Sequence, residues 1–382
     1  MPSAPVPARV LAATGPVALT GDAQIHPIVL PPGHPAGHGS LRLTLDVDAD
    51  GRIHAADPLG GLLHRGAEKL FEVRDYRQIL ALANRHDWLG GFAGELTIAR
   101  VVEEALGLDA PERAVWLRTI LSEFDRIHSH LTFLGAAPGG PSTALARDAV
   151  LQLVEDIAGS RMHPMLVRLG GLREDAPAGW EASARHTCAV VRSEMLSLTS
   201  AFADLAPTHR GLGVLTRESA ASFGASGPVA RAAGLTHDVR ADDPYAGYSI
   251  RGIWGEHSPG RAVHRSTGDV AARYAVLLEE VIVALDLVLA CLDRLTPGPV
   301  NVRLPKVVRV PEGQWYAVTE SPLGRAGALL VSRGGPQPWR LALRTPSFGN
   351  VAALSALLPG TMVTDLATVV ASVPFVMGDL DK

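Results

Sequence analysis

The sequence contains few cysteines: Cys188 and Cys291 are the two that occur among 382 residues, and neither belongs to a CxxC pair. Iron–sulfur clusters are held by several cysteine thiolates, so the chain cannot supply the ligands of such a cluster or of a nickel–iron site. Two isolated cysteines also disfavour a disulfide framework and suit small buried residues in a reducing compartment. Any redox centre is therefore expected in a partner, with no cofactor bound by this chain's own ligands.

The sequence also lacks an excess of positive charge. Lys plus Arg total 35 against 39 Asp plus Glu, which gives a net charge of −4. Such a balance creates no general attraction to phosphate backbones or anionic lipid, so no nucleic acid is expected as a partner. A hydrophobic content of 47% is sufficient for a large buried core, which predicts a globular protein.

A long uninterrupted hydrophobic run is missing as well. The most apolar segment, residues 275–292, contains Glu279, Glu280 and Asp286, and each of these charges is costly at the centre of a bilayer. The first 22 residues carry one Arg and scattered prolines without a continuous apolar stretch, unlike a secretory signal. The sequence therefore predicts a cytoplasmic protein whose association with a membrane is indirect.

The first two of four predicted regions precede the helices. Residues 1–30 are rich in Pro, Ala and Gly without helical or strand periodicity, which predicts an extended N-terminal lead-in. Residues 31–58 begin with a Pro- and Gly-rich loop that carries His34 and His38. Alternating apolar residues and a turn at Asp50-Gly51 follow, and these predict a β-hairpin that anchors the loop.

The other two regions are a helical core, residues 59–298, and a C-terminal α+β region, residues 299–382. Apolar residues at helical spacing predict helices at roughly 75–106, 111–134, 143–157, 182–205 and 267–295. Strand-like runs flank Gly334-Gly335, and a short helix is predicted near the C-terminus at roughly 363–372. The expected fold class is mainly α with β-hairpin elements at both ends.

The two loop histidines are the first candidate site. A zincin-type metal motif needs its histidines on a helix with an adjacent Glu, whereas Pro35-Ala36-Gly37 separates His34 from His38. No metal site is therefore predicted.

Several runs of the sequence resemble one known family, in the family's own order. Residues 33–39, GHPAGHG, are similar to its "GPQHPATHG" loop, and residues 60–69, GGLLHRGAEK, resemble "GLLHRGTEK". Residues 121–131, LSEFDRIHSHL, resemble "LFSEITRILNHL", and residues 160–163, SRMH, resemble part of "GARMH". With further blocks up to the terminal VMGDLD, the likeness covers residues 31–382. The family is the D-type subunit of NADH-quinone oxidoreductase, or complex I, which is related to [NiFe]-hydrogenase large subunits.

The resemblance implies a hydrogenase-large-subunit fold and a role in a larger enzyme. In that family the subunit packs against a partner that carries the terminal iron–sulfur cluster and against a C-type subunit, and quinone is the substrate that reaches their interface. It further implies an oxidoreductase of the translocase type, coupled to proton translocation and inactive as an isolated chain. The location implied is the cytoplasmic face of the cell membrane, with peripheral attachment through the complex.

The resemblance also implies roles for the loop histidines. The second histidine of the family loop hydrogen-bonds the quinone headgroup, which places this role on His38, with His34 beside it as a binding residue. An imidazole suits the role because its unperturbed pKa is about 6.5, so that it can donate a proton to a quinone oxygen that gains negative charge. The alternative is that His38 serves the turn before the hairpin.

Three more residues match family positions. Arg85 matches an arginine beside the terminal cluster, where a fixed positive charge would raise the cluster's potential. His130 is placed where a histidine would couple cluster reduction to protonation; alternatively it forms a polar helix face with Arg126. Glu68 is either a buried carboxylate on a proton route or an ion-pair partner of neighbouring Arg65 or Lys69.

The sequence departs from the family pattern at the expected quinone site. The family has "xxDY" after its arginine, with a tyrosine hydroxyl that binds quinone, whereas this chain has Trp88. The indole N–H of Trp88 can bind a headgroup but cannot yield an acidic proton. The family's "DxGALTP" segment is replaced by residues 136–142, which contain no carboxylate, and Arg325 replaces a Glu of "VPTESPRGE". Two functions stay open: a catalytic subunit, or a non-catalytic scaffold of a divergent complex I-like or hydrogenase-related assembly.

Overall fold

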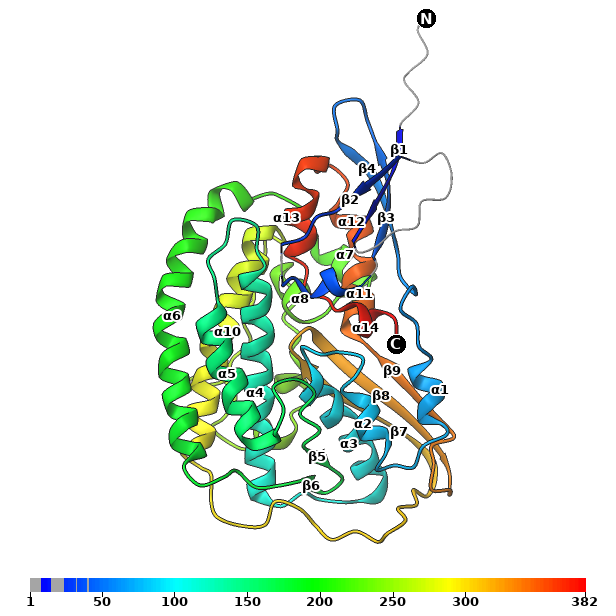
Figure 1. Cartoon of the computed structure of the whole chain (residues 1–382), viewed down its shortest axis with the longest axis vertical. Coiled ribbons are helices and arrows are strands. Elements are labelled where there is room, and N and C mark those ends of the chain that lie inside the picture. Colours follow the sequence, from blue (N-terminus) through cyan, green and yellow to red (C-terminus); the bar gives the residue numbers. More distant parts are fainter. Residues whose placement is uncertain (1–7, 15–23, 32, 40) are drawn as a thin grey trace, which may run out of the picture.

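The protein is described by a computed structural model that covers residues 8–14, 24–31, 33–39 and 41–382. Four long helices lie side by side along one flank of the molecule (Figure 1). They are α4 (Glu112–Gly135), α5 (Ala144–Ala158), α6 (Trp180–His209) and α10 (Val270–Leu292). All four were predicted from apolar spacing, and the structure confirms them. None of the helices within the described ranges is long and apolar enough to cross a membrane.

The single helix predicted at 75–106 is wrong, because the structure divides it. Helix α2 (Ile79–Ala83) ends before Asn84, and α3 (Gly91–Leu106) begins after Gly90. Between them the Asp87 side chain accepts a hydrogen bond from the Leu89 backbone N–H at 3.0 Å. Short polar side chains that bond nearby backbone groups compete with helix formation, and glycine weakens it further. The interruption presents Arg85 and Trp88 on a loop.

A four-stranded sheet occupies the N-terminal end of the chain (Figure 1). Its order is β2 (Gln24–Pro27), β1 (Ala8–Ala13), β3 (Arg42–Val47) and β4 (Ile53–Leu59). The predicted hairpin is confirmed as β3–β4, with Gly51 at a φ of 84° in its turn. Within the predicted extended lead-in, two described segments form strands: β1 pairs antiparallel with β3, and β2 pairs parallel with β1.

A second sheet lies over α3 and contains the strands predicted around Gly334-Gly335. It is antiparallel, in the order β7 (Glu312–Ser321), β8 (Gly324–Arg333) and β9 (Arg340–Arg344). The chain then returns to the first sheet through α11 (Pro346–Ala352), α12 (Leu354–Leu357), η3 (Val363–Asp365), α13 (Leu366–Ala371) and α14 (Met377–Leu380). A mainly helical fold with β-hairpin elements at both ends was predicted. The structure confirms it, since the hairpins β3–β4 and β7–β8 each lie within a small sheet.

Short elements connect these parts. They are η1 (Pro35–His38), α1 (Ala67–Phe71), β5 (Val167–Arg168), β6 (Gly171–Leu172), α7 (Arg217–Ser222), α8 (Gly227–Ala232), α9 (Val239–Asp242) and η2 (Ala246–Ser249).

Candidate functional site

The loop with the two histidines forms the short helix η1. His34 is its N-cap: Nδ1 of His34 accepts a hydrogen bond from the Ala36 backbone N–H at 3.1 Å. The His34 ring is buried, with its edge toward Phe133 and Phe375 at centroid distances of 5.8 and 6.2 Å. Burial lowers the pKa of His34 to about 4, so the ring is neutral at pH 7. His34 therefore fixes the loop, while the side chain of His38 lies outside the described residues.

Three segments that are distant in sequence meet at α14: the histidine loop, α14 itself and the loop that carries Trp88. Gly39, just after η1, packs so closely on Met377 of α14 that a β-carbon at Gly39 would overlap the methionine side chain. On its other side, Gly378 of α14 lies against the backbone carbonyl of His86, with equally little space. The C-terminal helix is therefore wedged between the histidine loop and the loop that carries Trp88.

Gly378→Ala is expected to lower the free energy of unfolding by about 1–3 kcal/mol, because overpacking forces backbone shifts. The added methyl group would push α14 away from His86. Gly37→Ala is the matched control, since no described atom lies within 4 Å of the β-carbon it would add. Urea denaturation of both variants tests the wedge: equal midpoints for the two would contradict it.

Buried titratable groups line this junction. Nε2 of His86 lies 3.7 Å from Oδ1 of Asp379, whose Oδ2 accepts a hydrogen bond from the Ser347 backbone N–H at 2.9 Å. Burial, and then the charge of Asp379, raise the pKa of Asp87 well above its ordinary value. Burial likewise raises the pKa of Asp379, although His86 opposes the change. Buried carboxyl groups that lie near each other retain protons more readily than exposed ones.

Arg85 lies on the exposed side of the same loop. One guanidinium nitrogen lies 3.2 Å from the Met165 sulfur, and Arg65 donates a hydrogen bond to the Arg85 carbonyl at 2.8 Å. His163 approaches from the segment after α5, where its Nδ1 lies 2.8 Å from the Asn84 carbonyl oxygen. Partial burial, followed by the charge of Arg85, lowers the pKa of His163. Arg85 and His163 are thus electrostatic neighbours.

The segment that carries His163 has a strained backbone. His163 has a φ of 57° and Met165 a φ of 48°, in the left-handed region that residues other than glycine seldom adopt. Such strain persists where the surrounding structure holds it, often at functional sites.

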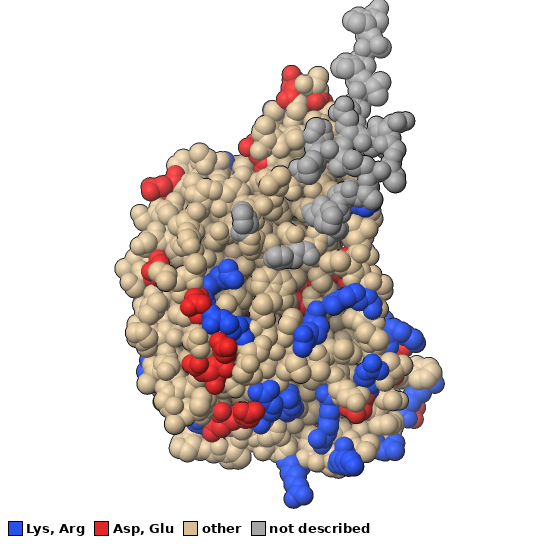
Figure 2. All heavy atoms as spheres, in the orientation of Figure 1, with Lys and Arg blue, Asp and Glu red and all other residues tan. Residues whose placement is uncertain are grey.

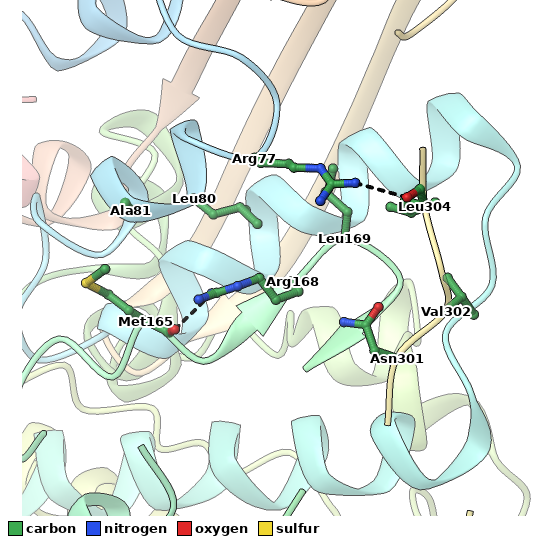
Figure 3. Close-up of a pocket in the computed structure, with 9 residues that line it drawn as sticks. All are labelled: Arg77, Leu80, Ala81, Met165, Arg168, Leu169, Asn301, Val302 and Leu304. Atoms are coloured by element: carbon green, nitrogen blue, oxygen red, sulfur yellow. Dashed lines mark hydrogen bonds between the residues drawn. The ribbon is translucent and has the colours of Figure 1, made fainter. Parts of the chain in front are cut away.

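A basic hollow adjoins Arg85. It has a volume of about 270 Å³ and lies between α2, β5 and residues 301–304 (Figure 3). Arg168 donates a hydrogen bond to the Met165 carbonyl at 2.9 Å, and Arg77 donates to the Pro305 carbonyl at 2.6 Å. Figure 2 shows more charged side chains over the lower half of the visible face than over its upper half.

A model of the family described as respiratory-chain NADH dehydrogenase, 49 Kd subunit, matches residues 135–309 and 304–382. The chain belongs to this family. It is 50% identical over 365 residues to the D-type subunit numbered 2 of the NADH-quinone oxidoreductase from Salinispora arenicola, with 92% of each chain covered. It is 48% identical to the D-type subunit numbered 1 from Streptomyces coelicolor and 33% identical to that numbered 2 from Rhizobium etli, each time over 92% of this chain and 94% of the relative.

His130, the histidine matched to the family's helix position, lies far from solvent. It is fully buried on α4, and its Nε2 lies 2.8 Å from a carboxylate oxygen of Glu280. Arg231 binds the same carboxylate at 2.6 Å, and burial lowers the pKa of His130. The described neighbour of Arg85 is therefore His163. The resemblance of residues 160–163 to the family run includes His163. The residue pattern alone, however, does not favour His163 over His130 as the neighbour of Arg85.

Glu68 forms ion pairs, but not with Arg65 or Lys69, the two partners considered from the sequence. It binds Arg340 of β9 and lies 3.2 Å from Nζ of Lys382, while Lys69 pairs with Glu72. Although burial raises its pKa, the Leu343 backbone N–H and Lys382 lower it overall. This position suits a structural ion pair between α1, β9 and the C-terminus.

The structure also describes the positions at which the sequence departs from the family pattern. Residues 136–142 make a tight turn between α4 and α5, in which the Gly140 N–H donates to the Ala137 carbonyl at 2.9 Å. Arg325 is exposed at the start of β8. Among the described residues, no group of three His, Cys, Asp or Glu side chains could hold a metal ion.

Proposed function

We propose that this chain forms the quinone-reduction pocket of an NADH-quinone oxidoreductase, against the subunit that carries the terminal iron–sulfur cluster. The observation that carries the proposal is the junction of η1, the Arg85–Trp88 loop and α14. At this junction a histidine loop and buried acids lie behind a surface that presents Arg85 and His163. Membership of the NADH dehydrogenase family supplies the substrate class.

The chemistry required is the addition of two electrons and two protons to a quinone. The partner's cluster would deliver the electrons to quinone bound between the loop with His38 and Trp88. Arg85 carries a fixed positive charge that would favour electron arrival at a cluster facing it. His38 would donate a hydrogen bond to the headgroup, while Asp87 and Asp379, whose pKa values are raised, are groups that can hold protons nearby.

The remaining partners follow from the same proposal. The basic hollow beside Arg85 and the strained segment at His163 would face the cluster subunit, and a C-type subunit would cover a further side. The assembly would sit peripherally at the cytoplasmic face of the cell membrane, act as a translocase coupled to proton movement, and be inactive as this chain alone. The hydrogenase-large-subunit fold belongs to the same proposal, since the family is related to those enzymes.

A second candidate function is a non-catalytic scaffold, which Trp88 and the turn at 136–142 favour. The test is NADH-driven quinone reduction by the purified complex, with the wild-type chain and with Trp88→Tyr. If the pocket is catalytic with Trp88 in place, the wild-type complex is expected to reduce quinone rapidly. Trp88→Tyr should then change the turnover rate by less than about tenfold, since both side chains can donate a hydrogen bond. A silent wild-type complex that gains turnover only when Trp88→Tyr supplies a phenolic hydroxyl would favour the scaffold.

A further inference from the structure

Three departures from the family pattern lie around one small cavity. Against "LFSEITRILNHL" the chain has Asp125 in place of Thr and His128 in place of Leu, and against "xxDY" it has Trp88 in place of Tyr. All three line a cavity of about 30 Å³ beneath the Arg85–Trp88 loop. A space of this size admits roughly one or two water molecules. Trp88 is far in sequence from Asp125 and His128, but all three line the same cavity.

The geometry gives the cavity polar walls. Asp125 and His128 are three residues apart on α4 and so project from one face. An Asp125 carboxylate oxygen accepts a hydrogen bond from the Ala93 backbone N–H at 3.2 Å. The Trp88 ring meets the His128 ring edge-on, with centroids 6.4 Å apart. His128 is 6% exposed, and its Nδ1 has no hydrogen-bond partner in the part of the chain that the structure describes.

A buried imidazole nitrogen without a partner is costly, and a bound water in a polar cavity removes that cost. The Asp125 carboxyl group opens on the same space. A water molecule bound between His128 and Asp125 would provide a hydrogen-bonded path from the Asp125 carboxyl group to the side of the cavity that Trp88 lines.

The charges around Asp125 suit a group that exchanges its proton near neutral pH. Burial raises the pKa of Asp125 to about 7, while the Ala93 N–H and Arg126 lower it and Glu95 of α3 raises it. Asp87 faces it from the Trp88 loop, and Arg161 and His163 line the cavity from the segment after α5. Burial, followed by the charge of Arg147, lowers the pKa of His128 to about 3, so His128 is neutral.

We propose that Asp125 is the proton donor that serves the Trp88 side of the quinone site, through water in this cavity. This inference rests on the proposed function. As quinone gains electrons from the partner's iron–sulfur cluster, the O–H bond of the Asp125 carboxyl breaks, its proton passes to the water, and a water proton forms the new O–H bond on the quinone. The Asp125 carboxylate then takes a proton from the buried pair Asp87 and Asp379 or from solvent. Trp88 closes the cavity but gives up no proton.

The experiment measures NADH-driven quinone reduction against pH in the assembled complex. The wild-type rate is expected to fall as the pH rises through about 7, because the protonated carboxyl is the donor. Asp125→Asn should lower turnover by about 100-fold and remove this part of the profile, since a positioned acid contributes on the order of 10²- to 10⁴-fold. Asp156→Asn, an exposed acid on neighbouring α5, should leave both unchanged.

A second pair of variants separates chemistry from folding. Asp125→Thr restores the family residue and should be slow alone, whereas Asp125→Thr with Trp88→Tyr should recover turnover, because the tyrosine hydroxyl then supplies the proton. Normal turnover and an unchanged profile in Asp125→Asn would overturn the inference, and so would a slow double variant in an intact complex. A wild-type complex without quinone turnover would instead overturn the proposed function.

Discussion

Arg231→Ala is expected to lower the free energy of unfolding by about 3–5 kcal/mol, the cost of breaking a buried ion pair from one side. Arg231 is fully buried, and its guanidinium lies 2.6 Å from carboxylate oxygens of both Glu280 and Glu320. Alanine would leave the two carboxylates buried without their main counter-charge. Because α8, α10 and β7 meet at this arginine, the loss should destabilise the core that supports the site.

An ion pair at the surface provides the control for the buried ion pairs of Arg231. Arg265 lies 2.8 Å from Glu279, the residue next to Glu280 on α10, but 40% of the Arg265 side chain is exposed. Exposed pairs contribute at most about 1 kcal/mol, so Arg265→Ala should cause little change. Urea unfolding of the two variants gives the comparison, and similar losses of stability would show that the buried network does not hold the core.

His38→Ala is expected to reduce quinone-dependent turnover of the assembled complex by about tenfold or more, because a donor to the developing negative charge on the headgroup would be lost. The loop that carries it is held by the His34 cap and by the packing of Gly39 on α14, so alanine should leave the backbone in place. Steady-state kinetics with NADH and a quinone analogue provide the measurement.

His54→Ala is a suitable comparison, since this exposed histidine of β4 pairs only with Asp48 among the described contacts. Its turnover should match the wild type. If His38→Ala assembles normally and also turns over at the wild-type rate, the proposed role of the loop is wrong.

Local patterns in the sequence predict most of the helical core. Helix α4 begins one residue after Pro111 and ends at Gly135, close to the predicted bounds, because proline favours a helix start, glycine favours a helix end, and both act within a single turn. The break between α2 and α3 escaped prediction because apolar spacing continues through it, while the cause is the Asp87 side chain and its backbone bond to Leu89. The pairing of β1 with β3 joins residues that are roughly thirty to forty positions apart, and no local pattern encodes it.

The candidate site could be predicted only in part, since residue type does not reveal burial. His130 and His163 both lie in runs that resemble the family, but one is buried against Glu280 and the other lies beside Arg85. The cavity at Trp88 was hidden for a similar reason, because Asp125 and His128 look like ordinary polar helix positions until α3 and the Trp88 loop cover them.

The central claim is that this chain forms one wall of the quinone pocket. Its most direct test is labelling of the assembled complex with a photoreactive quinone, followed by peptide mapping. Label is predicted in residues 33–39 and 85–91 of this chain, and an excess of unmodified quinone should suppress it. Specific labelling confined to other subunits, in a complex that reduces quinone, would contradict the claim.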